Sequence, residues 1–187
     1  MNETERLSYH ETYRVAVIGH TGKGKYGHAL DQACAGLPGV GIVALADPDE
    51  AGRASALRRT GAARGYADYE AMLVQERPDV VVVAAAHLEE REAIFLAGVE
   101  AGVRGIFTKK PFARSLDVAD RMLAAAAARA VKVAIAHQNR LRPAPRLARQ
   151  YLQAGELGRL RAIRTVGKCD QRGGGQDLLW LGTPCCP

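Results

Sequence analysis

The sequence predicts an α/β fold, a doubly wound parallel sheet of the Rossmann type, and three observations support this prediction. An apolar run at residues 15–18 leads into a glycine-rich loop at residues 22–27. A second apolar run at residues 40–46 ends in Asp47, twenty residues beyond Gly27. The run at residues 80–84, four valines and an alanine, is typical of a central parallel strand buried on both faces. Strand, loop, helix, strand and terminal acid in this order favour a dinucleotide-binding unit.

The remaining elements follow from the spacing of apolar residues and from helix breakers. Apolar residues at helical spacing predict a helix over residues 26–37, which Pro38 and Gly39 end. After the strand at 40–46, the expected order is helix 51–60, a short extended segment at 64–66, helix 69–75, strand 80–84, helix 88–101, strand 105–108, helix 115–129 and strand 131–136. This alternation predicts helices on both faces of one parallel sheet.

Each glycine of the loop has a mechanical reason. Gly22 permits the tight turn after the strand, Gly24 lets the backbone approach a pyrophosphate, and Gly27 lets helix and strand pack closely. The helix that follows would direct free N–H groups at the phosphates. Asp47 is expected to accept hydrogen bonds from the adenosine ribose, which favours NAD over NADP because a carboxylate repels a 2′-phosphate. The alternative is a glycine-rich turn in an unrelated α/β domain.

Composition narrows the class of protein. The 187 residues suffice for one domain, or one with part of a second, and a chain that is 48% hydrophobic and 25% charged is typical of a globular protein. The net charge of +6 comes from scattered arginines without interleaved aromatic residues, so we expect no nucleic-acid partner. The longest apolar run is far too short to span a membrane, and residues 1–11 lack a signal-peptide core. We therefore expect a cytoplasmic protein with no membrane partner.

The four cysteines predict neither a disulfide framework nor a metal site. Cys34 falls in a helical pattern, Cys169 stands alone, and Cys185 and Cys186 are adjacent. A zinc site requires spaced pairs of ligands, which this arrangement does not provide.

Several segments together resemble the glucose-fructose oxidoreductase and inositol dehydrogenase family, also written Gfo/Idh/MocA. The resemblance extends over residues 13–182, and its most specific parts are the glycine-rich loop and a Lys-Pro motif. The segments that carry it are residues 15–27, 44–48, 79–84, 100–102, 109–111, 138–143 and 155–160.

The resemblance implies a Rossmann domain that holds a nicotinamide cofactor, followed by an α/β domain that closes over a sugar, cyclitol or related polyol. It implies that Lys110 is catalytic, holding substrate near the nicotinamide and assisting proton movement. Lys109 replaces the family's glutamate, and partial burial beside this cation would lower the pKa of Lys110. Where the family has Thr-Pro, this chain has Ala86 and His87, and we expect the histidine to be a partly exposed loop residue. The expected cofactor-binding set is Gly19, Gly22, Gly24, Gly27, Asp47, Lys110 and Pro111.

The expected domains are an N-terminal extension at residues 1–12, the Rossmann domain at 13–142 and the start of the substrate domain at 143–187. Helix 145–153 and strand 160–166 would open this second domain. The family segment resembled by residues 173–183 normally continues to a catalytic histidine, whereas here residues 184–187 follow. We therefore expect a truncated substrate domain whose exposed apolar surface is liable to self-association.

Three functions stay open at this point. The first is an NAD-dependent oxidoreductase, although this chain alone would lack turnover. The second is a dinucleotide-binding module without catalysis. The third is a subunit that binds another chain through its C-terminal elements.

Overall fold

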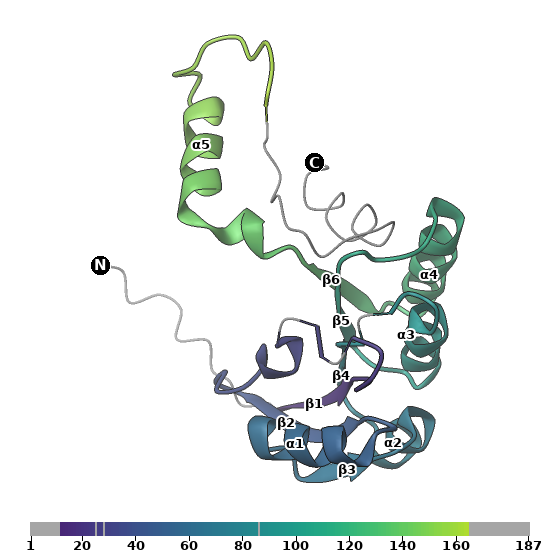
Figure 1. The fold of residues 1–187 in the computed structure, drawn as a ribbon. Coiled ribbons are helices and arrows are strands. Elements are labelled where there is room, and N and C mark those ends of the chain that lie inside the picture. The colour runs from purple at the N-terminus through teal and green to yellow at the C-terminus, as the bar shows by residue number, and fades with distance from the viewer. Residues whose placement is uncertain (1–11, 25, 28, 86, 165–187) are drawn as a thin grey trace. The chain divides into compact units, whose positions relative to one another are not determined.

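The computed structural model describes residues 12–24, 26–27, 29–85 and 87–164 (Figure 1). One compact unit ends at Ala134 and a second begins at Ile135. Six strands form one sheet in the order β3-β2-β1-β4-β5-β6, and the four pairs from β3 to β5 are all parallel. The strands are β1 (Tyr13–Ile18), β2 (Val40–Ala46), β3 (Arg64–Tyr66), β4 (Val80–Val83), β5 (Gly105–Lys109) and β6 (Lys132–Ala136).

The strand order reverses between β1 and β4, which is the doubly wound arrangement predicted from the sequence. The chain builds β1, β2 and β3 outward in one direction, then returns to the centre and builds β4, β5 and β6 in the other. The carboxyl ends of β1 and β4 therefore diverge into loops on opposite halves of the sheet. Ligands of open α/β sheets bind outside the strand ends at such a reversal.

Among the described residues, four helices connect the strands from β2 to β6, and their ends follow local sequence signals. They are α1 (Glu50–Thr60), α2 (Tyr69–Glu76), α3 (Arg91–Glu100) and α4 (Leu116–Ala128). Asp49 and Asp68 cap α1 and α2 by accepting hydrogen bonds from backbone N–H groups of the first turn. Gly61, with a φ of 71°, ends α1 in the left-handed conformation that glycine adopts without strain.

The main hydrophobic core lies between the sheet and the helices α2, α3 and α4. Alternate residues of the central strands, such as Ile18 and Val83, belong to the same buried cluster as Met72 of α2 and Phe95 of α3. The Phe95 ring packs edge-on against Phe112, with 5.7 Å between the ring centroids. Figure 1 shows α3 and α4 side by side along this half of the sheet. This packing fixes the ends of β4 and β5, where the candidate site lies.

The helix predicted over residues 26–37 is wrong, since the described part of this segment contains only a three-residue 3-10 turn, η1 (Leu30–Gln32). Gly27, Ala29 and Gly36 all have positive φ, between 41° and 74°. A residue in the left-handed region interrupts the i to i−4 ladder of an α-helix, so the apolar periodicity is present without the helix. Leu30 is nevertheless buried, as the pattern predicted.

The second unit contains η2 (Gln138–Leu141) and α5 (Pro143–Gln153), where the sequence predicted a helix from residue 145. No residue of α5 is buried, and Leu147 and Tyr151 are 50% and 41% exposed. The predicted strand at 160–166 is wrong over residues 160–164, which are irregular, and its last two residues lie outside the described residues. The expected apolar positions 178–180 also lie outside them. No helix in the described ranges is long and apolar enough to cross a membrane.

Candidate cofactor site

The glycine-rich loop lies at the reversal point of the sheet, after the carboxyl end of β1. Gly22 and Gly24 have φ values of 88° and 80°, which side-chain-bearing residues rarely adopt. A Cβ placed on Gly22 would meet no heavy atom within 4 Å, so the backbone there faces open space. The first of the three loop glycines, Gly22, comes four residues after Ile18, the last residue of β1. His20 and Thr21 separate Gly22 from Gly19.

Gly19 is needed for close packing rather than for an unusual φ. A Cβ at this position would lie 2.2 Å from Cε1 of Tyr26, so the tyrosine ring covers the first residue after β1. Tyr26 is 5% exposed, and the guanidinium of Arg59 stacks 5.1 Å from its ring centroid. Burial, and then the nearby Asp47 carboxylate, raise the pKa of the Tyr26 phenol well above its ordinary value. Tyr26 is therefore a neutral, packed residue that folds the loop back onto β1.

Asp47 lies at the carboxyl end of β2, as predicted, but it is fully buried. Its carboxylate accepts hydrogen bonds from the backbone N–H and the hydroxyl of Thr21 and from the backbone N–H of Asp49. The sequence predicted that Asp47 accepts hydrogen bonds from ribose hydroxyls. In the structure, groups of the protein itself donate the hydrogen bonds to this carboxylate. Sequence reasoning missed Thr21, and its signal was the extra spacing between the end of β1 and Gly22.

A cavity of about 430 Å³ lies between the glycine-rich loop and α1. The side chains that line it are mostly polar, and Asp31 and Arg59 form an ion pair in its wall. Its lining residues are Thr21, Gly24, Tyr26, Gly27, Ala29, Asp31, Gln32, Gly52, Ser55 and Arg59. The cavity adjoins the loop residues that the sequence assigned to the cofactor.

The Lys-Pro motif lies at the carboxyl end of β5, where Lys109 is 6% exposed, Lys110 is half-buried and Pro111 is buried. A Cβ on Gly27 would lie 2.2 Å from Nζ of Lys109, so this ammonium group packs against the third glycine of the loop. Burial, together with the charges of Arg91 and Lys110, lowers the pKa of Lys109 to about 8. The lowered pKa of Lys109 was not predicted from the sequence, and the lowered pKa expected for Lys110 stays a prediction.

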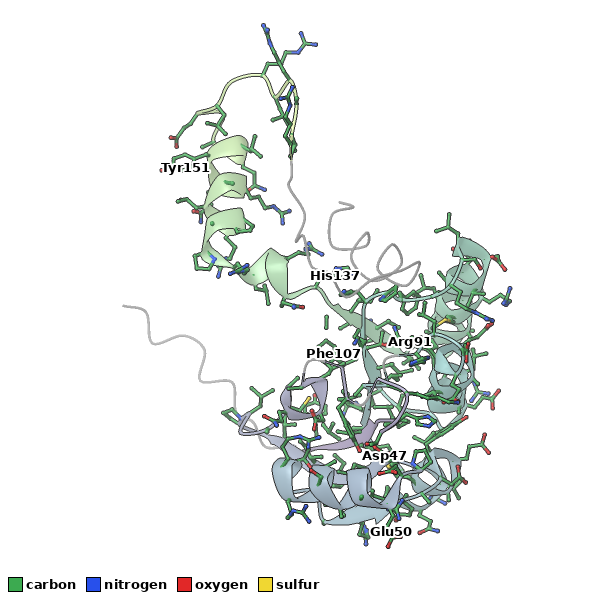
Figure 2. All side chains as sticks on the ribbon, in the orientation of Figure 1. Asp47, Glu50, Arg91, Phe107, His137 and Tyr151 are labelled. Carbon is green, nitrogen blue, oxygen red and sulfur yellow. The ribbon has the colours of Figure 1, made fainter. Side chains whose placement is uncertain are left out.

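Arg91 holds the motif in place from the first residue of α3. Its guanidinium is 1% exposed and donates hydrogen bonds to the backbone carbonyls of Lys109, Pro111 and Ala85. Figure 2 shows Arg91 and Asp47 in the sheet unit, with Arg91 toward α3 and Asp47 at the end of β2. Burial lowers the pKa of Arg91 to about 10, so the group stays charged at neutral pH. Sequence reasoning missed Arg91, although Ile94 and Phe95, three and four residues later, mark its helix face as buried.

A polar contact also joins the loop to the start of α3. Glu90 accepts hydrogen bonds from Lys23 and interacts with Nδ1 of His20 at 3.0 Å. The side chain of Lys23 is 45% exposed, and its ammonium group forms an ion pair with Glu90. His87 is half-buried, and Lys25 lies outside the described residues. No group of three or more metal-ligating side chains occurs in the described part of the chain.

The structure thus brings the glycine-rich loop together with two strand ends. Thr21 joins the loop to β2 through Asp47, and Gly27 joins it to β5 through Lys109. Lys110 and Pro111 follow at the same strand end as Lys109. Glycines, a carboxylate and cations therefore gather at the reversal point, where open α/β sheets bind their ligands.

Known proteins share both the sequence pattern and the fold. Over 122 residues the chain is 34% identical to D-apiose dehydrogenase from Paraburkholderia graminis, covering 65% of this chain and 32% of that protein. It is 33% identical over 131 residues to levoglucosan dehydrogenase from Pseudarthrobacter phenanthrenivorans, covering 68% of this chain and 32% of that protein. The chain thus spans about a third of the length of these curated relatives.

A solved oxidoreductase from Agrobacterium radiobacter, in complex with NAD+, L-tartaric acid and magnesium, has the same fold. It superposes with a TM-score of 0.70 at 23% identity, over 79% of this chain and 42% of that one. Residues 13–137 match the family model described as an oxidoreductase family with an NAD-binding Rossmann fold. The chain therefore belongs to the Gfo/Idh/MocA family of oxidoreductases, as the resemblance predicted.

Proposed function

We propose that this chain is the cofactor-binding domain of an oxidoreductase that transfers hydride between NAD and a sugar, cyclitol or related polyol. The observation that supports this function best is the glycine-rich loop at the reversal between β1 and β4, with Asp47 at the end of the neighbouring strand. Its relatives include dehydrogenases of levoglucosan and D-apiose, both carbohydrates by name. Bound NAD would accept or donate the hydride, and the residues of this chain would bind and orient it.

The loop fits a dinucleotide diphosphate. Open space in front of Gly22, and positive φ at Gly22 and Gly24, allow the backbone to approach an anionic group closely. The η1 turn is too short to supply a helix dipole, so this chain relies on other positive charge. The ammonium group of Lys109, packed against Gly27, supplies such charge beside the loop. We assign cofactor binding to Gly19, Gly22, Gly24, Gly27, Asp47, Lys110 and Pro111.

Asp47 supports a preference for NAD over NADP, because a carboxylate at this strand end repels a 2′-phosphate. Arg53 lies close by and donates a hydrogen bond to the backbone carbonyl of Asp47 at 2.7 Å. Its cationic group moderates the repulsion, so the preference is modest.

Lys110 is the residue to which we assign catalysis. It lies half-buried after the carboxyl end of β5, beside the loop that would hold the cofactor. A positioned lysine there can hold a substrate hydroxyl and take its proton as hydride leaves. If the remainder of a relative's chain is joined to residues 1–142, Lys110→Ala should lower kcat by about a hundredfold. An unchanged rate would assign the proton transfer to another group.

Binding of NADH, followed by fluorescence, tests the proposed function directly. Gly24→Val should abolish binding, because a β-branched side chain at positive φ displaces the backbone that contacts the diphosphate. Gly36→Val is the matched control, since Gly36 has a similar φ of 74° but lies outside the loop. Equal loss in both variants would mean that backbone strain, rather than the loop itself, explains the effect. Retained affinity in Gly24→Val would contradict the assignment.

The 187-residue chain alone should bind cofactor without oxidising a polyol. Hydride transfer requires two carbons in near-attack geometry, and the described residues after β6 form only η2 and α5. Turnover of a polyol by this chain with NAD would contradict this expectation.

Exposed apolar side chains favour self-association as a second candidate function of the C-terminal residues. Leu147, Leu160 and Ile163 are between 50% and 68% exposed. Sedimentation should show mass increasing with concentration, and limited proteolysis should remove the region after Arg142 while sparing residues 13–136. A protease-resistant monomer would contradict both expectations.

A further inference from the structure

Thr21 donates hydrogen bonds to the Asp47 carboxylate, the group that the proposed function assigns to the adenosine ribose. Its hydroxyl donates to Oδ2 of Asp47 at 2.7 Å, and its backbone N–H lies 3.1 Å and 3.0 Å from the two carboxylate oxygens. The backbone N–H of Asp49 donates to Oδ1 at 3.0 Å. A carboxylate has about four acceptor positions, so these contacts fill it.

The site is shaped to hold Thr21 in this position. Gly52, in the first turn of α1, lies so close that a Cβ there would be 2.0 Å from Oγ1 of Thr21. The N–H of Gly52 is itself fixed by the side chain of Asp49, which caps the helix. Thr21 is thus enclosed between the end of β2 and the start of α1, and only glycine at position 52 leaves room for it.

We propose that Thr21 is a specificity-determining residue that competes with the adenosine ribose for Asp47. This inference rests on the proposed function. A ribose can use the carboxylate only when Thr21 has moved away, so the free protein is mostly in a state that does not recognise the ribose. The apparent dissociation constant of NADH then equals its intrinsic value divided by the fraction of protein in the open state. The contact therefore weakens the binding of NADH. NADPH does not use the free carboxylate, so the contact also reduces the difference in affinity between NADH and NADPH.

Removal of the hydroxyl tests the competition. Thr21→Ala should tighten NADH binding by about tenfold, the factor expected when one hydrogen bond to a charged group no longer competes. NADPH binding should change by less than about twofold, so the ratio of the two dissociation constants should rise. Thr60→Ala is the matched control, because Thr60 also donates a side-chain hydrogen bond, to the Ala56 carbonyl within α1.

A second variant acts on the same contact from the other side. Gly52→Ala places a methyl group where Oγ1 of Thr21 lies and should expel the threonine, with the same tightening for NADH. The double variant Thr21→Ala/Gly52→Ala should bind NADH no more tightly than the better single variant, because both changes relieve one contact. Fully additive gains would place the two effects at separate sites and overturn the inference.

Hydrogen exchange provides a readout that does not depend on affinity. The N–H of Thr21 should be protected in the free protein, because Asp47 accepts it, and should exchange faster when NADH is bound. Increased protection on binding would overturn the inference, as would unchanged affinities for both dinucleotides in Thr21→Ala. If wild type and every variant bind neither dinucleotide, the proposed function itself is wrong and the inference falls with it.

Discussion

The carboxyl ends of β2 and β5 both direct charged groups into the protein beside the glycine-rich loop, but they accommodate charge in different ways. At β2 the buried Asp47 carboxylate is surrounded by N–H and O–H donors from Thr21 and Asp49. At β5, burial and then the charges of Arg91 and Lys110 lower the pKa of the Lys109 ammonium group. The carboxylate at β2 thus accepts several hydrogen bonds from the protein, whereas burial and neighbouring cations lower the pKa of the lysine at β5.

The two strand ends therefore respond differently to the absence and the presence of a ligand. A carboxylate saturated by protein donors contributes to the folded state without any ligand. A bound anion favours the charged form of a nearby lysine, so a phosphate or diphosphate beside Lys109 would raise its pKa again. The guanidinium of Arg91 makes the β5 arrangement possible because it binds the backbone on both sides of Lys110.

The largest effect is expected from breaking the β5 end. Arg91→Met leaves three buried carbonyls without their donor, at about 1 to 3 kcal/mol each. Removal of a buried charge recovers part of this loss, and we expect a net decrease of about 3 kcal/mol or more in the free energy of unfolding. Urea denaturation measures it, with Arg121→Met on the exposed face of α4 as the control. Equal losses in the two variants would contradict a special role for Arg91.

The next largest effect, from replacing Lys109, is an increase in the free energy of unfolding that depends on pH. Lys109 has a folded pKa of about 8 against 10.5 for an ordinary lysine, so between these values the unfolded chain binds more protons. The free energy of unfolding should therefore rise with pH across this window. Lys109→Met should stabilise the protein at pH 7 by up to about 3 kcal/mol and remove this rise. Lys132→Met, at an exposed strand position, serves as the control, and a rise that persists in Lys109→Met would assign it to another group.

Sequence patterns predicted the alternation of strands and helices because local signals determine where these elements lie and where they end. The valines of β4, the caps at Asp49 and Asp68 and the break at Gly61 all act within a few residues. The helix predicted after the loop is wrong, because the spacing of apolar residues carries no information about backbone φ. Positive φ at Gly27, Ala29 and Gly36 is compatible with apolar spacing but not with a continuous helix.

The sequence predicted which residues lie in the candidate site, but it predicted only part of what they contact. Asp47 was found because the end of an apolar strand is visible in the sequence, and the Lys-Pro motif was found through the family resemblance. Whether they bind cofactor stays a prediction. The partners Thr21 and Arg91 contact groups 26 and 18 residues away along the chain, and such contacts depend on tertiary packing. For the same reason the buried lysine of the motif could not be distinguished from its neighbour.

A smaller loss of stability is expected at the β2 end. Asp47→Asn keeps the size of the side chain but turns an NH2 group toward donors that need an acceptor. We expect the free energy of unfolding to fall by about 2 kcal/mol, within the range for hydrogen bonds to a charged group. Asp49→Asn is the control, since asparagine caps a helix about as well as aspartate. If Asp47→Asn unfolds at the wild-type urea concentration, the donors do not depend on the charge.

The smallest effect is expected where the loop meets α3, between the two strand ends. Glu90 accepts from Lys23 and His20, and the hydrogen bond from Lys23 is the largest cause of its lowered pKa. A carboxyl group with a lowered folded pKa contributes stability above its ordinary pKa and loses it as the pH falls through the folded value. Both partners are well exposed, so solvent and salt screen the pair. Glu90→Gln should therefore cost less than roughly half the loss in Asp47→Asn at neutral pH, and the difference from wild type should vanish in acid and shrink in high salt. Glu89→Gln, one residue earlier and exposed, is the matched control, and a loss as large as that of Asp47→Asn would show that the loop depends on α3 as strongly as on β2.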